Sequence, residues 1–180
     1  MTNKIFITGS SKIDKLEYAK RIVSRNDDLS ISQSFTNDEK YKDSVTDDYV
    51  YYLDLKDIDL SYKNNAFLFI NAKDNIYTGI TFDSFYNEDI VCLDIKEFNS
   101  IPDYIFSQND ILVIWLDTKI KGRDKSNDDD IFATKHLIEK IDKLNVMYFL
   151  DEDPDVVVDK IIEYVSGNEE TKQALLEENY

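Results

Sequence analysis

The chain has 180 residues, a length that corresponds to one domain with a full hydrophobic core. Acidic residues outnumber basic ones by 37 to 21, which gives a formal net charge of -16. This charge opposes contact with nucleic-acid phosphates and with anionic membranes, so we expect neither as a direct partner. It is compatible with a basic protein partner.

Cysteine content and apolar runs bear on the compartment. Cys92 is the only cysteine, which excludes an intramolecular disulfide and a zinc site built from cysteines, and fits a reducing cytosol. The apolar run at residues 5–7 is far shorter than the core of a signal peptide, and no apolar stretch approaches about 18 residues. We therefore expect a soluble, cytoplasmic protein.

Only 4 glycines and 2 prolines occur, and there is no repeat or flexible linker, so residues 1–180 are expected to form a single domain. The chain opens with a short buried strand at residues 5–7, followed by a loop of glycine and serine. A helix should follow, because apolar residues then recur at helical spacing, namely Ile13, Leu16, Ala19, Ile22 and Val23.

The next part of the chain, about residues 29–80, has the patterns of a small mixed sheet. Alternation and β-favouring residues predict four strands and one helix, at residues 29–34, 49–53, 66–70 and 76–80 for the strands and 55–62 for the helix. The last two strands are expected to be antiparallel neighbours. A polar, acidic loop should occupy residues 36–48.

Continuous apolar runs at residues 90–93 and 111–116 are typical of parallel strands that helices cover on both faces. A helix at 129–143 and a strand at 146–150 should follow. Asp153 and Pro154 then have the pattern of a helix start, and this last helix is expected to end before Gly167, with a tail at 167–180. The fold class is therefore α/β: a parallel sheet flanked by helices, with a small mixed insertion.

The loop after the first strand is a candidate phosphate-binding site, since backbone N–H groups and a helix N-terminus converge there. Residues 9–16 read GSSKIDKL against the P-loop pattern G-x-x-x-x-G-K-[ST]. Asp14 replaces the second glycine and would repel phosphate, and Leu16 cannot bind Mg²⁺. Two interpretations stay open: an ordinary strand-to-helix turn, or a modified loop that contacts nucleotide through Gly9, Ser10, Ser11, Lys12 and Lys15.

Asp117 ends the central apolar strand, where ligand crevices open in α/β sheets. Asp117 could cap or stabilise a loop there, or it could bind a metal ion. Its position is about equally compatible with both roles. His136 stands alone on a predicted helix and fits a surface position better than a catalytic base.

The order of the motifs resembles that of guanylate kinases, a family of P-loop nucleoside monophosphate kinases. The resemblance spans about residues 4 to 165. It includes an Asp-Tyr-x-Phe-like strand at 48–52, an Asn-Tyr-Tyr-Gly-like turn at 75–79, a Leu-Asp-Ile-Asp-like strand end at 93–96 and a lid at 121–123. Two further segments, residues 29–34 and 64–69, also resemble strands of the family. The resemblance implies a P-loop kinase-like sheet, a nucleoside-monophosphate-binding-like subregion at about 29–80 and a lid-like segment at about 118–130.

The resemblance also implies roles for individual residues. Ser32 matches a serine that contacts guanine, and Tyr49 and Tyr77 match tyrosines that bind the phosphate of the nucleotide. Asp94 matches an acidic residue near the metal. Arg123 matches an arginine of the lid.

Other functional positions of the family are changed. The two arginines that grip the monophosphate should lie near residues 36–39, where Asp38 and Glu39 stand instead. The two carboxylates that read guanine correspond to Phe69 and Lys96. Since phosphoryl transfer depends on positive groups placed around the phosphate, we do not expect efficient phosphorylation of GMP.

Three functional hypotheses follow. The first is a catalytically degenerate guanylate-kinase-like domain that needs no cofactor and binds another protein, with a basic protein as one candidate, through a cleft that exposes Tyr49, Tyr77 and Phe69. The alternative is an atypical nucleoside monophosphate kinase that uses ATP, Mg²⁺, Lys15 and Arg123. The third is an acidic decoy that inhibits a basic nucleic-acid-binding protein.

Overall fold

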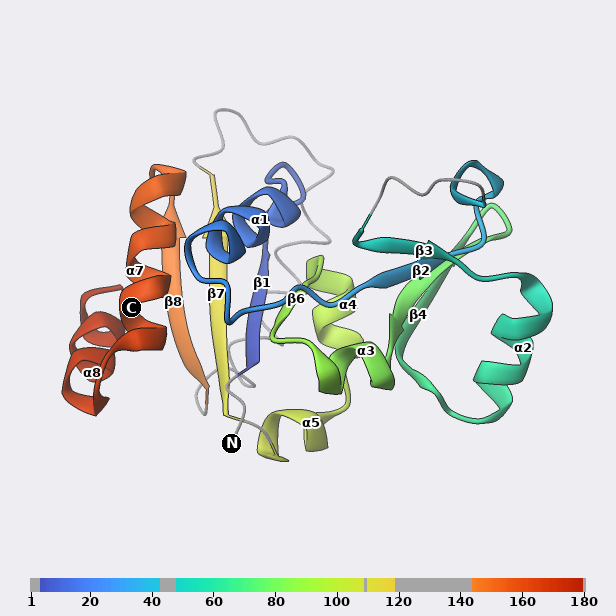
Figure 1. Cartoon of the computed structure of the whole chain (residues 1–180). Coiled ribbons are helices and arrows are strands. Elements are labelled where there is room, and N and C mark those ends of the chain that lie inside the picture. Colours follow the sequence, from blue (N-terminus) through green and yellow to red (C-terminus); the bar gives the residue numbers. More distant parts are fainter. Residues whose placement is uncertain (1–3, 43–47, 109, 119–143, 180) are drawn as a thin grey trace.

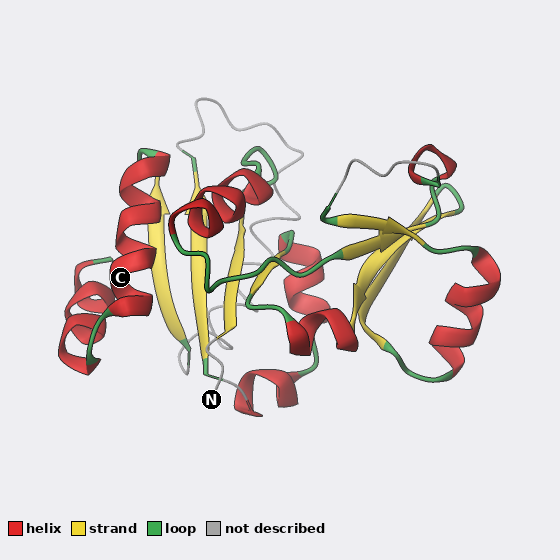
Figure 2. Cartoon of the chain, viewed as in Figure 1, coloured by secondary structure: helices red, strands yellow, loops and turns green. Residues whose placement is uncertain are grey.

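The computed structural model describes residues 4–42, 48–108, 110–118 and 144–179. Within these residues the strands form two four-stranded sheets that lie side by side (Figures 1 and 2). Most of the predicted lid-like segment with Arg123, and the helix predicted at 129–143, fall outside the described residues. That residues 1–180 form a single domain stays a prediction.

The larger sheet is parallel throughout. Its order is β6-β1-β7-β8, with bounds Ile90–Cys92, Lys4–Gly9, Ile111–Asp117 and Asn145–Leu150. The two central strands are buried along almost their whole length, as their continuous apolar sequences predict. The predicted parallel sheet is therefore confirmed.

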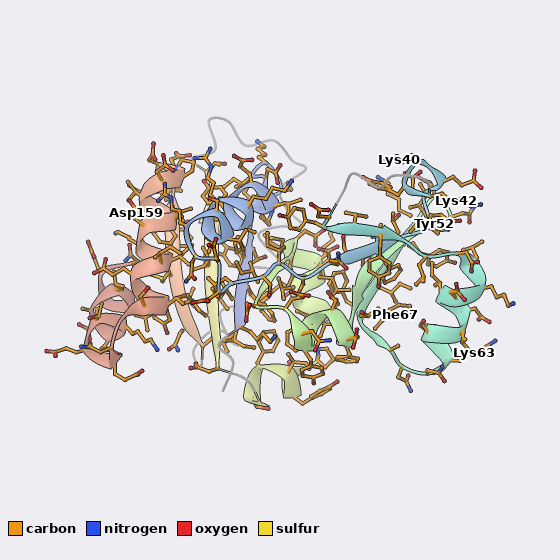
Figure 3. The ribbon with its side chains drawn as sticks, in the orientation of Figure 1. Lys40, Lys42, Tyr52, Lys63, Phe67 and Asp159 are labelled. Carbon is orange, nitrogen blue, oxygen red and sulfur yellow. The ribbon has the colours of Figure 1, made fainter. Side chains whose placement is uncertain are left out.

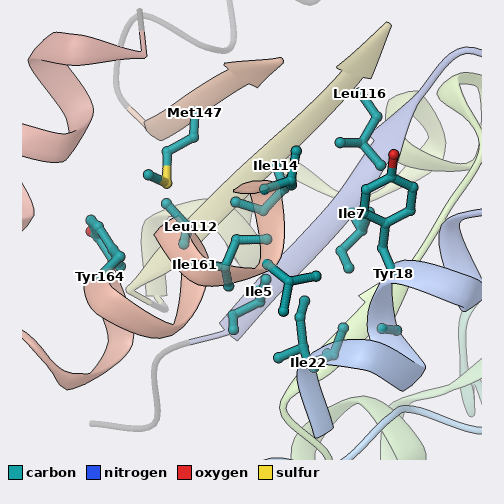
Figure 4. Close-up of a cluster of buried hydrophobic side chains, with 14 of the residues drawn as sticks. Ile5, Ile7, Tyr18, Ile22, Leu112, Ile114, Leu116, Met147, Ile161 and Tyr164 are labelled. Atoms are coloured by element: carbon teal, nitrogen blue, oxygen red, sulfur yellow. The ribbon is translucent and has the colours of Figure 1, made fainter. Parts of the chain in front are cut away.

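Helices cover both faces of this sheet. One face packs against α1 (Lys15–Arg25), α7 (Pro154–Ser166) and α8 (Glu169–Glu178), and its core includes Ile7, Ile22 and Ile161 (Figure 4). The other face packs against α3 (Phe82–Asn87), α4 (Ile95–Ser100) and α5 (Asp103–Gln108). None of the helices in the described ranges has the length and apolar content needed to cross a bilayer.

Aromatic rings fill the second face. Phe6 of β1 is fully buried and meets the rings of Phe98 and Phe106 edge-on, each at 5.9 Å between centroids. The ring of Phe85 lies 6.0 Å away. Such tilted and edge-to-face pairs are favourable arrangements, so this cluster ties α3, α4 and α5 to the central strand.

The smaller sheet is mixed. Its order is β3-β2-β5-β4, with bounds Val50–Tyr52, Ser34–Thr36, Ile76–Thr81 and Phe67–Lys73. Strands β2 and β3 are parallel, and β4 and β5 form an antiparallel hairpin. The hairpin turns at Asp74 and Asn75, which both have positive φ angles, as two-residue turns that match the strand twist require.

Helix α2 (Leu55–Lys63) connects β3 to β4 and packs against the small sheet, with Ile58 as its buried residue. On the opposite side of the sheet, Phe69 and Ile80 belong to the same hydrophobic core as Phe6. The predicted mixed insertion is confirmed, and one of its faces is continuous with the core of the larger half.

The prediction of a strand at residues 29–34 is wrong for most of this segment. Only Ile31 makes an isolated bridge, to Ile90 at the edge of the larger sheet, and β2 begins at Ser34. The segment is held elsewhere, because the Ser30 hydroxyl donates to Asp89 at 2.7 Å and the Ser32 amide donates to Ile90 at 2.8 Å. It therefore runs beside β6 before it enters the small sheet.

The predicted tail also has regular structure. Asn168 caps α8 through a hydrogen bond from the Thr171 amide, and Leu175 is buried against the larger core. The carbonyl of Asn179 accepts a hydrogen bond from Tyr148 of β8 at 2.8 Å. Residues 169–179 are thus part of the packed structure.

Candidate functional site

The loop after β1 begins at Gly9, which has a φ of +121°. The next amide, of Ser10, donates to the Leu116 carbonyl of β7 at 2.8 Å. A Cβ atom at Gly9 would lie 2.0 Å from that carbonyl oxygen. Both the backbone angle and the close approach therefore require glycine at this position. The hydrogen bond from Ser10 holds the start of the loop against the carboxyl end of β7.

Asp14 caps the N-terminus of α1. Its Oδ1 accepts hydrogen bonds from the amides of Leu16 at 3.0 Å and Glu17 at 3.2 Å. These amides are among the donors that make a helix N-terminus attractive to anions. In this protein a carboxylate of the chain itself already occupies them.

Lys15 turns back onto the same loop. Its Nζ donates to the carbonyl of Ser10 at 2.9 Å and to that of Ile13 at 3.3 Å. Burial lowers the pKa of Lys15, against the opposite effect of nearby carboxylates, first that of Asp94. Lys12 is exposed, and its amide donates to the Ser10 hydroxyl at 3.3 Å. The structure thus gathers the predicted loop residues at one place.

Asp94 begins α4 and is not the end of a strand as predicted. It forms a capping box with Glu97: the Glu97 amide donates to Asp94 at 2.7 Å, and the Asp94 amide donates to Glu97 at 2.8 Å. Within the described ranges, no three metal-binding side chains form a group. A metal role for Asp94 stays a prediction.

Glu97 also joins the two halves of the molecule. Its Oε1 accepts a hydrogen bond at 2.9 Å from the side-chain amide of Asn71 in β4. Burial raises the pKa of Glu97, while the hydrogen bonds from Asp94 and Asn71 lower it in part. A half-buried carboxylate and amide therefore face each other between α4 and the small sheet.

The raised pKa of Glu97 gives a prediction for pH. A carboxyl whose pKa is higher in the folded state stabilises that state most below its ordinary value of 4.5, and this contribution is lost as the pH rises through the raised value. Glu97→Gln should remove that loss, so the free energy of unfolding of the variant minus that of the wild type should increase from pH 4 to neutral pH. Urea denaturation across this range measures it, and a constant difference would contradict the assignment.

Tyr77 lies on the face of the small sheet that α2 covers. It pairs with Ala72, and both line a cavity with Leu55 and Ile58 of α2. Thr78, and not Tyr77, pairs with Asn71. Thr78 therefore lies on the opposite face of the sheet, the face on which Asn71 contacts Glu97. The turn here has one residue more than the Asn-Tyr-Tyr-Gly pattern, and a shift of one residue moves a side chain to the other face of a strand.

Ser32 and Tyr49 make contacts of their own. Ser32 is buried, and its hydroxyl donates to the Ser84 carbonyl of α3 at 3.5 Å. Tyr49 packs against the larger core, and Lys20 of α1 lies 5.0 Å from the centroid of its ring. The nucleotide roles of Ser32, Tyr49 and Tyr77 stay predictions.

Phe69 is buried, although it belongs to the lining of a cavity of about 420 Å³ beside β4. Its side chain is only 7% exposed because it packs into the core around Phe6, so the expectation of an exposed Phe69 is wrong. Asp38 caps the short 3₁₀ helix Glu39–Tyr41 and pairs with Lys40 at 3.0 Å. Hydrogen bonds from Lys40 lower the pKa of Asp38, which keeps a negative charge where the resemblance would place arginine.

A cavity of about 280 Å³ opens at the carboxyl ends of β7 and β8, beside the loop after β1. Ile13 and Tyr18 form one wall, and the described lining includes the acidic residues Asp117, Asp151 and Glu152 but no lysine or arginine. Asp117 accepts a hydrogen bond from the Tyr148 hydroxyl at 3.0 Å. Burial and this contact raise the pKa of Tyr148 to about 12. The cavity has the position of an α/β ligand crevice, with an acidic lining.

Together the parallel sheet with its glycine loop and the adjoining mixed sheet define an α/β fold with a second, smaller sheet. The solved structure of the guanylate kinase from Anaplasma phagocytophilum matches with a TM-score of 0.51 and 12% sequence identity, covering 90% of this chain and 83% of that one. The chain thus has a guanylate-kinase-like fold. No family model and no curated protein matches the sequence.

Proposed function

We propose that this chain is a guanylate-kinase-like domain that has lost phosphoryl transfer and acts by binding another protein, a basic one, in the cytoplasm. The observation that carries the proposal is the cap on α1. Asp14 accepts the hydrogen bonds of the Leu16 and Glu17 amides, so a phosphate at this helix end would meet a carboxylate and two occupied donors.

The distribution of positive groups supports the same proposal. Two of the three arginines in the sequence, Arg21 and Arg25, lie on α1 and pair with Asp155 and Asp159 of α7. Lys15 donates to carbonyls of its own loop. Phosphoryl transfer is driven by cations around the moving phosphate, and these groups already have structural partners.

One observation favours the alternative, an atypical nucleoside monophosphate kinase that takes ATP and Mg²⁺. Asn71 and Glu97 form a half-buried amide and carboxylate pair beside the buried Phe69. Such a pair offers donors and an acceptor for a nucleobase. Phe69 and Lys96 at the two guanine-reading positions favour a base other than guanine. This alternative would use Lys15 and Arg123 at the phosphates.

A nucleotide panel separates the two functions. We expect the wild-type chain to show no rise in melting temperature with GMP, other nucleoside monophosphates or ATP with Mg²⁺, and no ADP release in a coupled assay with ATP. Ligands that bind the folded state must raise the melting temperature by mass action. A rise with one nucleoside monophosphate, together with ADP release, would replace our proposal by the alternative.

Asp14→Gly tests the observation that carries the proposal. Glycine is a tolerated N-cap, so we expect a loss of only a few tenths of a kcal/mol in stability. The freed amides should then bind inorganic pyrophosphate about tenfold more tightly or better than the wild type does, since a hydrogen bond to a charged group contributes about 1.5–3 kcal/mol. Calorimetric titration measures the affinity.

The matched control is Asp54→Gly, because Asp54 caps α2 in the same way through the Asp57 amide at 2.8 Å. That change alters net charge equally but leaves the loop after β1 intact. Equal gains in pyrophosphate affinity in both variants would mean that overall charge, and not the α1 cap, excludes the anion.

A further inference from the structure

The hydroxyl of Tyr18 in α1 has no hydrogen-bond partner among the described residues, although Tyr18 is only 9% exposed. A buried tyrosine normally pairs its hydroxyl, because an unpaired polar group away from water is unfavourable. The hydroxyl lies on the side of Leu116, away from Ile22 (Figure 4). Tyr18 and Leu116 both line the cavity of about 280 Å³ at the carboxyl ends of β7 and β8, so the unused hydroxyl points into that cavity.

Three carboxylates line the same cavity, which we call the acidic crevice: those of Asp117, Asp151 and Glu152. Asp117 is half-buried, and it accepts hydrogen bonds from the Thr118 amide at 2.7 Å and from the Tyr148 hydroxyl at 3.0 Å. A carboxylate offers about four acceptor positions, so Asp117 keeps about two for a ligand. The described lining holds no lysine, arginine or histidine. The acidic crevice therefore selects a cation over a phosphate or another anion.

Cations of the neighbouring helices have partners outside the acidic crevice. Arg21 of α1 pairs with Glu17 at 3.1 Å and with Asp155 at 3.2 Å. Lys160 of α7 donates to the side chain of Asn179 at 2.7 Å. The labelled lysines of the small half lie at the opposite end of the molecule from α7 (Figure 3). Arg21 and Lys160 are thus engaged elsewhere.

The rest of the lining is mostly apolar, and the volume is small. Ile13 and Val157 contribute aliphatic side chains, and Phe149 contributes a ring. In the part of the chain that the structure describes, the carboxylates do not converge into a metal-binding group. At about 280 Å³ the crevice lies just below the range of about 300–1,000 Å³ that is usual for pockets of drug-sized ligands. A single side chain with an apolar stem and a cationic end fits these properties better than a metal ion or a large molecule.

Among cationic side chains, arginine matches the acceptors of the crevice best. Its guanidinium carries more N–H donors than the ammonium of lysine, and it holds them in a fixed fork. The acceptors come from different walls, since Tyr18 belongs to α1, Asp117 ends β7 and Glu152 precedes α7. A guanidinium is also less strongly hydrated than an ammonium, so its burial is less unfavourable.

We propose that the acidic crevice binds the side chain of one arginine of a basic partner protein. The guanidinium would donate to the Tyr18 hydroxyl and to the open positions of the Asp117 carboxylate, with the exposed Glu152 at the rim. The methylene stem would lie along the apolar walls. This inference rests on the protein-binding role proposed above, and it names the contact by which a basic partner would be recognised.

The test uses a blocked pentapeptide with one arginine between glycines, and the same peptide with citrulline in place of arginine. Citrulline has the shape of arginine but carries a neutral urea group instead of the cation. Titrations followed by ¹H–¹⁵N NMR measure both affinities for the full chain. We expect the arginine peptide to bind with a dissociation constant of about 1 mM or below, about tenfold or more tighter than the citrulline peptide, and to shift the amide signals of residues 117–118 and 151–152.

Tyr18→Phe removes only the hydroxyl and should weaken binding of the arginine peptide about tenfold or more, as expected for a hydrogen bond to a charged group. The melting temperature should stay within about 2 °C of the wild-type value, because the hydroxyl has no partner among the described residues. The matched control is Tyr164→Phe. Tyr164 is buried in the same core but is absent from the described lining of the crevice, so this change should alter affinity less than about twofold.

A second pair of variants tests the charge of the rim. Glu152→Gln should weaken binding of the arginine peptide about two- to fivefold, the usual contribution of an exposed ion pair. The matched control is Glu163→Gln, which changes net charge equally. Glu163 is exposed on α7 and does not belong to the described lining, so its change should leave the affinity nearly unaltered.

Several results would overturn the inference: no binding at about 1 mM arginine peptide, equal binding of the citrulline peptide, or equal affinities within either pair of variants. Agmatine, which is arginine without its carboxyl group, tests the other source of the same chemistry. Tighter binding of agmatine than of the peptide would assign the crevice to a free organic cation and would also overturn the inference. Failure of the proposed function gives a different result, because it consists of ADP release in the nucleotide panel whatever the arginine peptide does.

Discussion

Replacing Gly9 by alanine should lower the free energy of unfolding by about 3 kcal/mol or more. The methyl group would lie 2.0 Å from the Leu116 carbonyl oxygen, on a residue whose φ is +121°. That oxygen belongs to backbone that pairs with both β1 and β8, so it cannot move without disturbing the larger sheet. Equilibrium unfolding in urea measures the change.

The control for this variant is Ser11→Ala, an exposed position two residues further along the same loop. Its effect should stay within about 0.5 kcal/mol, as for most surface substitutions. A Gly9→Ala variant as stable as the wild type would mean that the loop can leave Leu116. The geometry that brings Ser10, Lys12 and Lys15 together would then not be fixed by this close approach.

Phe6→Ala should cost about 3–5 kcal/mol, the usual loss for a buried phenylalanine. The ring is fully buried, and the rings of Phe85, Phe98 and Phe106 surround it. Its removal would leave a cavity between the central strand and three helices. The melting temperature and the urea midpoint should both fall.

Leu60→Ala serves as the control, because it removes an apolar side chain that is 59% exposed and should cost far less. If Phe6→Ala lost no more stability than Leu60→Ala, the second core would have to be loosely packed, in contrast to the ring contacts described above.

The long elements of the fold could be predicted because each is long enough to show its apolar pattern in the sequence. Continuous apolar runs predicted β1 and β7, and Asp153 with Pro154 predicted the start of α7. Helices α3, α4 and α5 have six residues each, fewer than two turns, so their apolar residues show no repeat that a pattern can detect. Tertiary packing around Phe6 defines them instead.

The candidate site could be predicted only where its residues are consecutive. Gly9 and Lys12 lie in one loop and Lys15 begins the helix that follows it, so these residues could be found together. Glu97 and Asn71 are 26 residues apart and come together only through the packing of α4 against the small sheet. A possible signal was present for Glu97, which stands three residues after Asp94 as in a capping box, but nothing in the sequence indicates its partner in β4.

Tyr77 shows that a sequence motif does not give the face of a strand on which a residue lies. The motif has one residue more than the pattern it resembles, and in the structure Thr78 pairs with Asn71 while Tyr77 lines the cavity beside α2. Only the pairing register of the hairpin shows on which face Tyr77 lies, because sequence similarity does not determine the face of a strand.

The cap that Asp14 places on α1 has a consequence for how the protein would behave in a cell. A helix that carries its own anion needs no phosphate ligand to satisfy its first amides. Under the proposed function, the folded fraction of the chain should therefore not vary with the supply of nucleotides, in contrast to an enzyme that its substrates stabilise. A partner would then find the same amount of folded protein in growing and in starved cells.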